Sequence, residues 1–288
     1  MRYALTCAVG LFVVGCGGEV GSAGDVGGEP PLQGPAIAED PIDDGPARPA
    51  TPPSSRGPSA SEDSPLPSGA LRTRCTTVVD QPGGSRIATV DLDSGRTELG
   101  ATVTLPDPIN LSSLGARGRK LFACGGSGVV RVDMKTGAVD EAKTPCDAVS
   151  ADATGIWVLD HARRGLRRYV DWAALRADAP AELAPAPDDA ARVAIRGTTL
   201  VASAYSGNVV TVMESGAAPR AVGLEAFYGS IAGMDVAADG RRLLLTSSDA
   251  GYAGVMVFDM KTGAFLSSLS STVDSPTGLH GLACETVE

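Results

Sequence analysis

The hexapeptide Asp-Met-Lys-Thr-Gly-Ala occurs at positions 133–138 and again, unchanged, at 259–264. Each copy follows an apolar, β-branched run, and a looser version of the motif at 90–95 follows a similar run. The turn aspartates of the loose copy and the first exact copy lie 42 residues apart, and those of the two exact copies lie 126 residues apart, which is three times 42. A fixed period in the forties, built on a strand and a tight turn, is typical of a β-propeller. The repeat therefore predicts an all-β domain made of four-stranded blades.

Alignment on this period places four inner hairpins at regular intervals, each made of two short apolar runs around a glycine-containing turn. Their turn glycines are Gly118, Gly155, Gly197 and Gly240. The ends of the predicted domain are incomplete, because 281–284 form an inner strand with nothing after it and 74–79 form a second strand with no inner partner. Pairing of the two ends completes a further blade and closes the ring without exposed strand edges. The prediction is a five-bladed propeller over 73–288, with six blades as the alternative if the irregular stretch 160–190 contains another blade.

The first 72 residues differ from the rest in composition. Residues 1–15 combine Arg2 with an apolar stretch too short to span a bilayer, which predicts an export signal peptide. The signal ends in Val-Val-Gly followed by Cys16, which resembles the lipobox of bacterial lipoproteins, where the cysteine is lipidated. An ordinary secretory signal with an incidental cysteine is the alternative. Residues 16–72 are then a lipidated cysteine and a linker rich in Pro, Gly, Ser and Asp, which is expected to be disordered because it cannot bury a core.

The charge distribution argues against a nucleic-acid partner. Of the net charge of −10, residues 17–70 contribute −7, from nine acidic residues and two arginines. The remaining domain is nearly balanced, and its basic run at 163–168 is local and flanked by Asp160 and Asp171. Such a domain offers no extended basic surface to a phosphate backbone.

Four cysteines remain in the predicted propeller. An even number in an exported domain suggests two disulfides, and four cysteines allow three pairings. The strand layout favours Cys75 with Cys284, on neighbouring strands of the shared blade, and Cys124 with Cys146, on one blade and at the beginning of the next. Free buried thiols are the alternative.

The Asp-Met-Lys-Thr-Gly-Ala repeats, with the apolar strands before them, resemble the repeats of YVTN-type and quinoprotein-like β-propellers from about residue 73 to the C-terminus. The resemblance implies that the turn aspartates and glycines are structural, because Asp caps the tight turn and Gly adopts the left-handed conformation. It says little about activity, since this fold is used by enzymes, binding modules and scaffolds. A pyrroloquinoline quinone enzyme would need Trp-bearing docking repeats, and the chain has only Trp157 and Trp172, neither in such a repeat. No cofactor is therefore expected.

Candidate chemistry is limited to carboxylates near the beginnings of the inner strands and to one histidine. These residues are Asp107, Asp147, Asp188 or Asp189, Asp235 and His280. In a closed ring they would converge on one mouth of the central channel, where they would bind Ca²⁺ through oxygen ligands or act as an acid/base pair on a sugar. Their offsets within the repeat differ, so the alternative is that several face elsewhere and that His280 is structural. His161 lies in a charged loop and is expected to be solvated, and no residue is assigned as catalytic or as a metal ligand.

The leading functional hypothesis is a non-catalytic binding module, monomeric and lipid-anchored in the bacterial cell envelope, whose partner is an envelope protein or a glycan. The outer membrane is the expected location, because Gly17 follows Cys16 in place of the aspartate that retains lipoproteins in the inner membrane. One alternative is a hydrolase, lyase or lactonase that uses the channel carboxylates, with Ca²⁺ as a candidate ion. Another is a structural subunit of an envelope assembly.

Overall fold

The computed structural model describes residues 72–163, 165–204, 207–227, 229–247, 254–271 and 278–287. The predicted signal peptide, Cys16 and all of the linker except Arg72 lie outside the described residues. The chain divides into two units, 1–61 and 62–288, and every described residue belongs to the second. In the part of the chain that is described, no helix has both the length and the apolar character needed to cross a bilayer.

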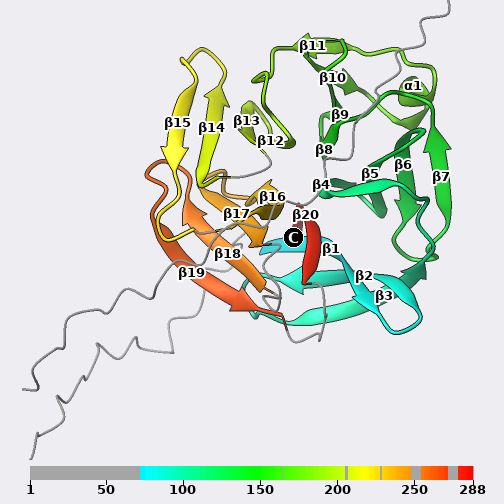
Figure 1. Cartoon of the computed structure of the whole chain (residues 1–288), viewed down its shortest axis with the longest axis horizontal. Helices are drawn as coiled ribbons and strands as arrows, with labels where there is room; N and C mark the ends of the chain where they lie inside the picture. Colours follow the sequence, from blue (N-terminus) through cyan, green and yellow to red (C-terminus); the bar gives the residue numbers. More distant parts are fainter. Residues whose placement is uncertain are drawn as a thin grey trace, which may run out of the picture. The chain divides into compact units, whose positions relative to one another are not determined.

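The described residues form five four-stranded antiparallel sheets arranged around a common axis, as Figure 1 shows. We call these sheets blades and number them from the one that contains the first strand. Blade 1 consists, from the axis outward, of β20 (Leu279–Val287), β1 (Arg72–Gln81), β2 (Gly84–Asp91) and β3 (Thr97–Val103). Its inner strand thus comes from the C-terminal end of the chain.

Each of the other four blades uses strands that are consecutive in the sequence. Blade 2 consists of β4 (Ile109–Arg117), β5 (Lys120–Gly125), β6 (Gly128–Asp133) and β7 (Val139–Ala142). Blade 3 consists of β8 (Ala148–Asp152), β9 (Gly155–Asp160), β10 (Gly165–Tyr169) and β11 (Glu182–Ala184). Blade 4 consists of β12 (Arg192–Arg196), β13 (Thr199–Ser203), β14 (Val209–Glu214) and β15 (Arg220–Gly223). Blade 5 consists of β16 (Ile231–Val236), β17 (Arg242–Ser247), β18 (Gly254–Asp259) and β19 (Phe265–Ser270).

The prediction of an all-β, five-bladed propeller is confirmed, and the six-bladed alternative is wrong. The stretch 160–190 forms the outer part of blade 3, because it contains β10, the short helix α1 (Trp172–Arg176) and β11. Asp171 caps α1 by accepting a hydrogen bond from the backbone N–H of Ala174. Leu175 of α1 is buried in the cluster between blades 2 and 3, so the helix adds to that interface and not to a new blade.

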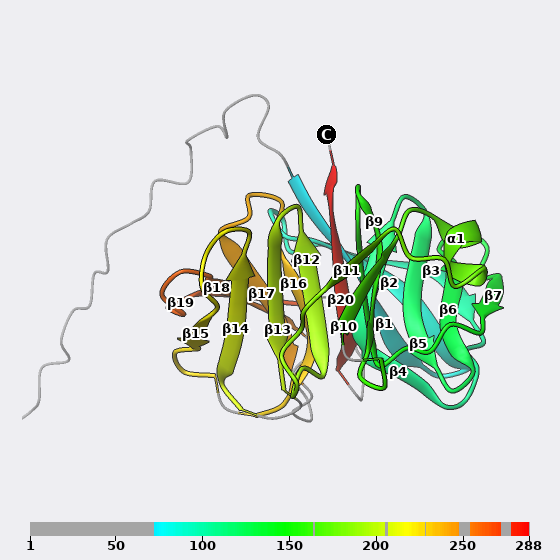
Figure 2. The same ribbon diagram turned by 90° about the horizontal axis from the view of Figure 1, so that it is seen from above.

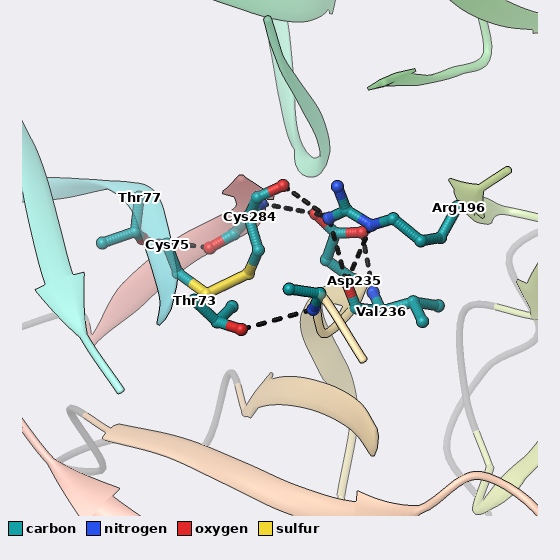
Figure 3. Close-up of a disulfide and its surroundings, with 9 residues drawn as sticks. Thr73, Cys75, Thr77, Arg196, Asp235, Val236 and Cys284 are labelled. Atoms are coloured by element: carbon teal, nitrogen blue, oxygen red, sulfur yellow. Dashed lines mark hydrogen bonds and ion pairs between the residues drawn. A yellow bond between two sulfur atoms is a disulfide. The ribbon is translucent and has the colours of Figure 1, made fainter. Parts of the chain in front are cut away.

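The ring closes where the two ends of the described chain pair with each other. β20 runs antiparallel to β1 with Cys75 opposite Cys284, and a disulfide joins these two cysteines (Figure 3). A second disulfide joins Cys124 on β5 to Cys146, which precedes β8, and so links blade 2 to blade 3. Both predicted disulfides and the predicted pairing of the ends are therefore present.

The repeated hexapeptide forms the turn between the third and fourth strands of a blade. In blade 2, Asp133 accepts hydrogen bonds from the backbone N–H and the hydroxyl of Thr136, and Asp259 accepts the equivalent bonds in blade 5. Gly137 and Gly263 have φ angles of 74° and 77°, in the left-handed region that strains any residue with a Cβ. The turn aspartates and glycines are thus structural residues.

These turns also contact the neighbouring blade. A Cβ added to Gly137 would collide with the carbonyl oxygen of Thr102 on β3, and one added to Gly263 would collide with that of Gly223 on β15. Gly95, in the loose copy of the motif, has a similar φ of 68°, but no atom lies within 4 Å of its added Cβ. The exact copies therefore need glycine for backbone conformation and for packing between blades, and the loose copy needs it for conformation alone.

We expect Gly137→Ala and Gly263→Ala to lower the free energy of unfolding more than Gly95→Ala does. All three place a methyl group at a left-handed φ, which costs about 1–2 kcal/mol. Only the first two also force that methyl group into the adjacent blade, which adds an overpacking cost of about 1–3 kcal/mol. Urea unfolding measures the three differences, and equal losses would contradict the packing role of the exact copies.

Five hydrophobic clusters fill the spaces between neighbouring blades, one at each interface of the described ring. The largest, between blades 4 and 5, contains fourteen buried residues of the described chain, including Phe227 and Phe258. The smallest, between blades 3 and 4, contains eight, and three of these are alanines: Ala148, Ala190 and Ala202. Among the described residues, the interface between blades 3 and 4 therefore has the smallest cluster of buried hydrophobic side chains.

Candidate functional site

The inner strands run along the axis of the ring, as the side view in Figure 2 shows. Contacts between neighbouring inner strands show that they point in the same direction. The backbone N–H of Ile195 on β12 donates a hydrogen bond to Ser150 Oγ on β8. Two residues further along the sequence in each case, the backbone N–H of Gly197 donates to the Asp152 carboxylate. Residues that precede these strands therefore lie at one mouth of the channel, and residues near their ends lie at the other.

The structure does not bring the predicted channel-mouth residues together. Asp107, Asp147 and Asp189 are exposed and precede β4, β8 and β12, and His280 is near the beginning of β20. Asp235 is instead the fifth residue of β16 and is buried, so it lies toward the opposite mouth. Across the described residues, no group of three or more His, Cys, Asp or Glu side chains is placed to hold a metal ion.

Asp147, His161 and His280 each make a hydrogen bond within the fold. Asp147 accepts a hydrogen bond from the backbone N–H of His161, at 2.7 Å. The exposed His161 ring lies 2.7 Å from the carbonyl oxygen of Ala190, measured from Nε2. His280 Nε2 lies 3.0 Å from Asp80 Oδ2 on β1, within the blade where the chain ends meet. These contacts connect the loops of blades 3 and 4 and the two strands of the closure.

Asp235 belongs to a buried network that joins three blades (Figure 3). Its carboxylate accepts hydrogen bonds from the backbone N–H groups of Val236 and Cys284 and lies 3.8 Å from the Arg196 guanidinium. Arg196 of blade 4 also donates to the carbonyl oxygens of Val236 in blade 5 and Cys284 in blade 1. Burial raises the pKa of Asp235 to about 6, against the opposing effects of Arg196 and the two N–H donors. Asp235 is thus part of the ring closure.

Replacement of Asp235 should reveal this titration. The folded-state pKa of about 6 lies above the roughly 3.9 of an unstructured aspartate. The stabilising contribution of the bound proton is therefore fully present below about pH 4 and is lost as the pH rises through 6. Between pH 4 and pH 7, the unfolding free energy of the wild type should fall by roughly 2–3 kcal/mol relative to Asp235→Asn. Urea unfolding at several pH values measures this difference.

Asp259→Asn is the control with the opposite sign. Hydrogen bonds from Thr262 lower the pKa of Asp259, so the wild type should lose stability relative to this variant only as the pH falls below about 4, with no change between about pH 4 and pH 7. A pH-independent difference between the wild type and Asp235→Asn would contradict the buried ionisable role of Asp235.

A groove of about 820 Å³ lies between blades 3 and 4. Its apolar lining includes six residues from the strands of the two blades: Trp157, Leu166, Ala184, Ile195, Leu200 and Met213. Two smaller cavities, of about 410 and 260 Å³, flank the same interface, one beside His161 and Asp188 and the other beside Asp189 and Asn208. The main groove is of the size typical of ligand sites, roughly 300–1,000 Å³. All three cavities thus occur at the blade interface with the smallest core.

Short strands and small side chains leave this groove unfilled. β11, the outer strand of blade 3, has three residues, and β15, the outer strand of blade 4, has four. Along β14, Val210 and Val212 are buried against blade 5, while the residues that alternate with them face the other way. Of these, Val209 is 49% exposed, and Thr211 and Met213 are partly exposed. The side of β14 that faces blade 3 is therefore incompletely covered.

The charged residues of the groove leave two carboxylates accessible. Arg168 Nε donates to Glu182 at 2.8 Å, and its Nη1 donates to the carbonyl oxygen of Thr154 at 3.1 Å. The same guanidinium lies 5.8 Å from the Trp157 ring, so Arg168 is already engaged on three sides. The side chains of Glu182 on blade 3 and Glu214 on blade 4 are 48% and 47% exposed. The groove therefore presents an apolar surface between two accessible carboxylates.

The sequence repeat does not predict this groove, because the repeat fixes where strands and turns fall and not how well two blades fill the space between them. The available signal is composition. Residues 177–191, which contain β11, are rich in alanine, proline and aspartate. Such a segment supplies few large side chains to a blade interface.

No protein-family model matches the chain, and no curated protein matches its sequence. Its fold is similar to that of several solved structures. Myxococcus xanthus glutaminyl cyclase is 14% identical over 63% of this chain and 85% of that chain, with a TM-score of 0.42. A nidogen/laminin complex is 12% identical over 69% and 76%, with a TM-score of 0.39, and YCF48 bound to D1 peptide is 12% identical over 68% and 67%, with a TM-score of 0.33. Similarities this distant do not indicate a function.

Proposed function

We propose that this propeller is a non-catalytic binding module that holds part of another protein in the groove between blades 3 and 4. The observation that carries the proposal is that a groove of about 820 Å³ coincides with the blade interface that has the smallest cluster of buried hydrophobic side chains. An apolar concavity with a few polar groups at its rim is the usual form of a binding site. Glu182 and Glu214 supply such groups from the two walls.

A protein segment fits the groove better than a glycan does. Sugar rings commonly stack on the open face of an aromatic side chain. Trp157 is the aromatic residue of the groove, but it is only 7% exposed and Arg168 lies over its ring. The accessible surface is aliphatic, from Leu200 and Met213, and methionine adapts its shape to different apolar side chains.

The alternative is a hydrolase, lyase or lactonase that uses the channel carboxylates. The direction of the inner strands separates Asp235 from the other candidate carboxylates, and among the described residues no three His, Cys, Asp or Glu side chains are grouped to hold a metal ion. Asp235 is also occupied by two backbone N–H groups and by Arg196. The geometry therefore favours binding over catalysis.

We also propose that the module is attached to the bacterial envelope, with the outer membrane as its location, through a lipid on Cys16. The support is the sequence Val-Val-Gly-Cys at the end of an apolar signal. The chain between Cys16 and β1 would then be the tether that separates the propeller from the lipid surface. For a coil of this length, the mean distance between its ends is roughly 40 Å.

Filling the groove should abolish partner binding while the propeller stays folded. Ala184→Trp places a large side chain in the groove, whereas Leu183→Trp adds the same side chain to the opposite face of β11, where Leu183 is 70% exposed. Affinity capture from envelope extracts should recover a protein with the wild type and with Leu183→Trp, and roughly tenfold less or none with Ala184→Trp. Equal recovery by the two variants would exclude the groove as the binding site.

Lipidation is tested separately. Cys16→Ser should abolish incorporation of a radiolabelled fatty acid and move the protein from the membrane fraction to the soluble fraction. Cys7→Ser, within the apolar stretch of the signal, should change neither result. Label retained by Cys16→Ser would contradict the proposed anchor.

A further inference from the structure

Building on the proposed function, we propose that the protein segment bound between blades 3 and 4 carries an apolar side chain next to a lysine or an arginine. The apolar surface of the groove calls for the apolar side chain, and the accessible carboxylates call for the lysine or arginine. Neither half depends on the predicted anchor or on the channel residues.

The need for an apolar side chain comes from the unequal burial of the groove surface. Leu166 and Ile195 are 1% and 4% exposed, so they form a closed back wall that belongs to the core. Leu200 and Met213 are only partly buried and line the groove in front of them. An aliphatic or aromatic side chain of the ligand would remove this remaining apolar surface from water. A polar side chain would lose hydrogen bonds to water there and find few replacements.

The need for a positive charge comes from the acidic residues of the two walls. Glu182 and Glu214 line the groove from opposite blades, and about half of each side chain is exposed. Arg168 lines the groove too, but it is paired with Glu182 at 2.8 Å. Arg220 approaches Glu214 only to 3.8 Å. A lysine or arginine of the ligand would therefore be attracted to Glu214, whereas an acidic segment would meet like charge there.

Selection of random peptides displayed on phage, with the full chain purified in detergent as the target, tests this composition without assuming it. We expect the recovered peptides to share an aliphatic or aromatic residue beside Lys or Arg. Synthetic copies should bind Glu214→Gln more weakly than the wild type, by roughly two- to fivefold. Their affinity should also fall as the salt concentration rises.

Glu141→Gln is the matched control for charge. It removes one carboxylate from β7, the outer strand of blade 2, where Glu141 is exposed and remote in the ring from the groove. Glu214→Gln leaves the Arg168–Glu182 pair intact, so a loss of affinity reports the Glu214 charge. Peptides should bind Glu141→Gln as tightly as the wild type.

Recovered peptides that are acidic or uncharged would overturn the proposal, and so would equal binding to Glu214→Gln and the wild type or the recovery of no peptide. Ala184→Trp distinguishes this failure from failure of the proposed function. Peptides of another composition that no longer bind Ala184→Trp would exclude the ligand class and keep the groove as the binding site. Basic apolar peptides that bind Ala184→Trp and the wild type equally would exclude the groove itself.

Discussion

The pairing of β20 with β1 is the contact on which the other blade interfaces depend. Without it, blade 1 would lack its inner strand and the ring would have two unpaired edges. The Cys75–Cys284 disulfide joins residues 209 positions apart at this seam. Arg196 and Asp235 add hydrogen bonds that connect blade 4, blade 5 and the C-terminal strand. The closure is therefore supported by a covalent bond, a strand pair and a buried polar network.

A closed ring restricts how each blade interface can pack. In an open stack of sheets, small side chains would allow two neighbouring sheets to move closer together. In the closed ring, blade 3 is held by its cluster with blade 2, and blade 4 is held by the larger cluster with blade 5. Blades 3 and 4 therefore cannot move together to fill the space lined by Ala184, Pro185 and Ala217 without disturbing these contacts. The groove thus follows from the closure together with the small residues that line it.

The sequence predicts the parts of the structure that depend on the conformation of local turns and on the number of residues between repeated motifs. The Asp-Met-Lys-Thr-Gly-Ala turn has one conformation in both blades where it occurs, because Asp133 and Asp259 make the same hydrogen bonds. Its spacing therefore predicts the number of blades, the seam and the positions of the paired cysteines. The stretch 160–190 fits the repeat poorly, because α1 and a three-residue outer strand replace the regular pattern there.

The site required information that the repeat does not contain. Asp235 and Asp147 both lie near an inner strand, but one is close to the end of its strand and the other precedes it, which places them at opposite mouths. The groove depends on side-chain sizes in two blades at once. Its residues, such as Leu166 and Met213, are separated in sequence and follow no motif. The alanine-, proline- and aspartate-rich composition of 177–191 is the local sequence signal of the groove.

Site-specific photo-crosslinking in intact bacteria tests the central claim most directly. A photoreactive amino acid in place of Met213 would lie on the groove surface, and one in place of Phe265 would lie on the outer strand of blade 5, where Phe265 is 43% exposed. The account predicts a discrete crosslinked complex from position 213 and none of the same mass from position 265. The same complex from both positions, or a complex from position 265 alone, would contradict the assignment of the groove as the binding site.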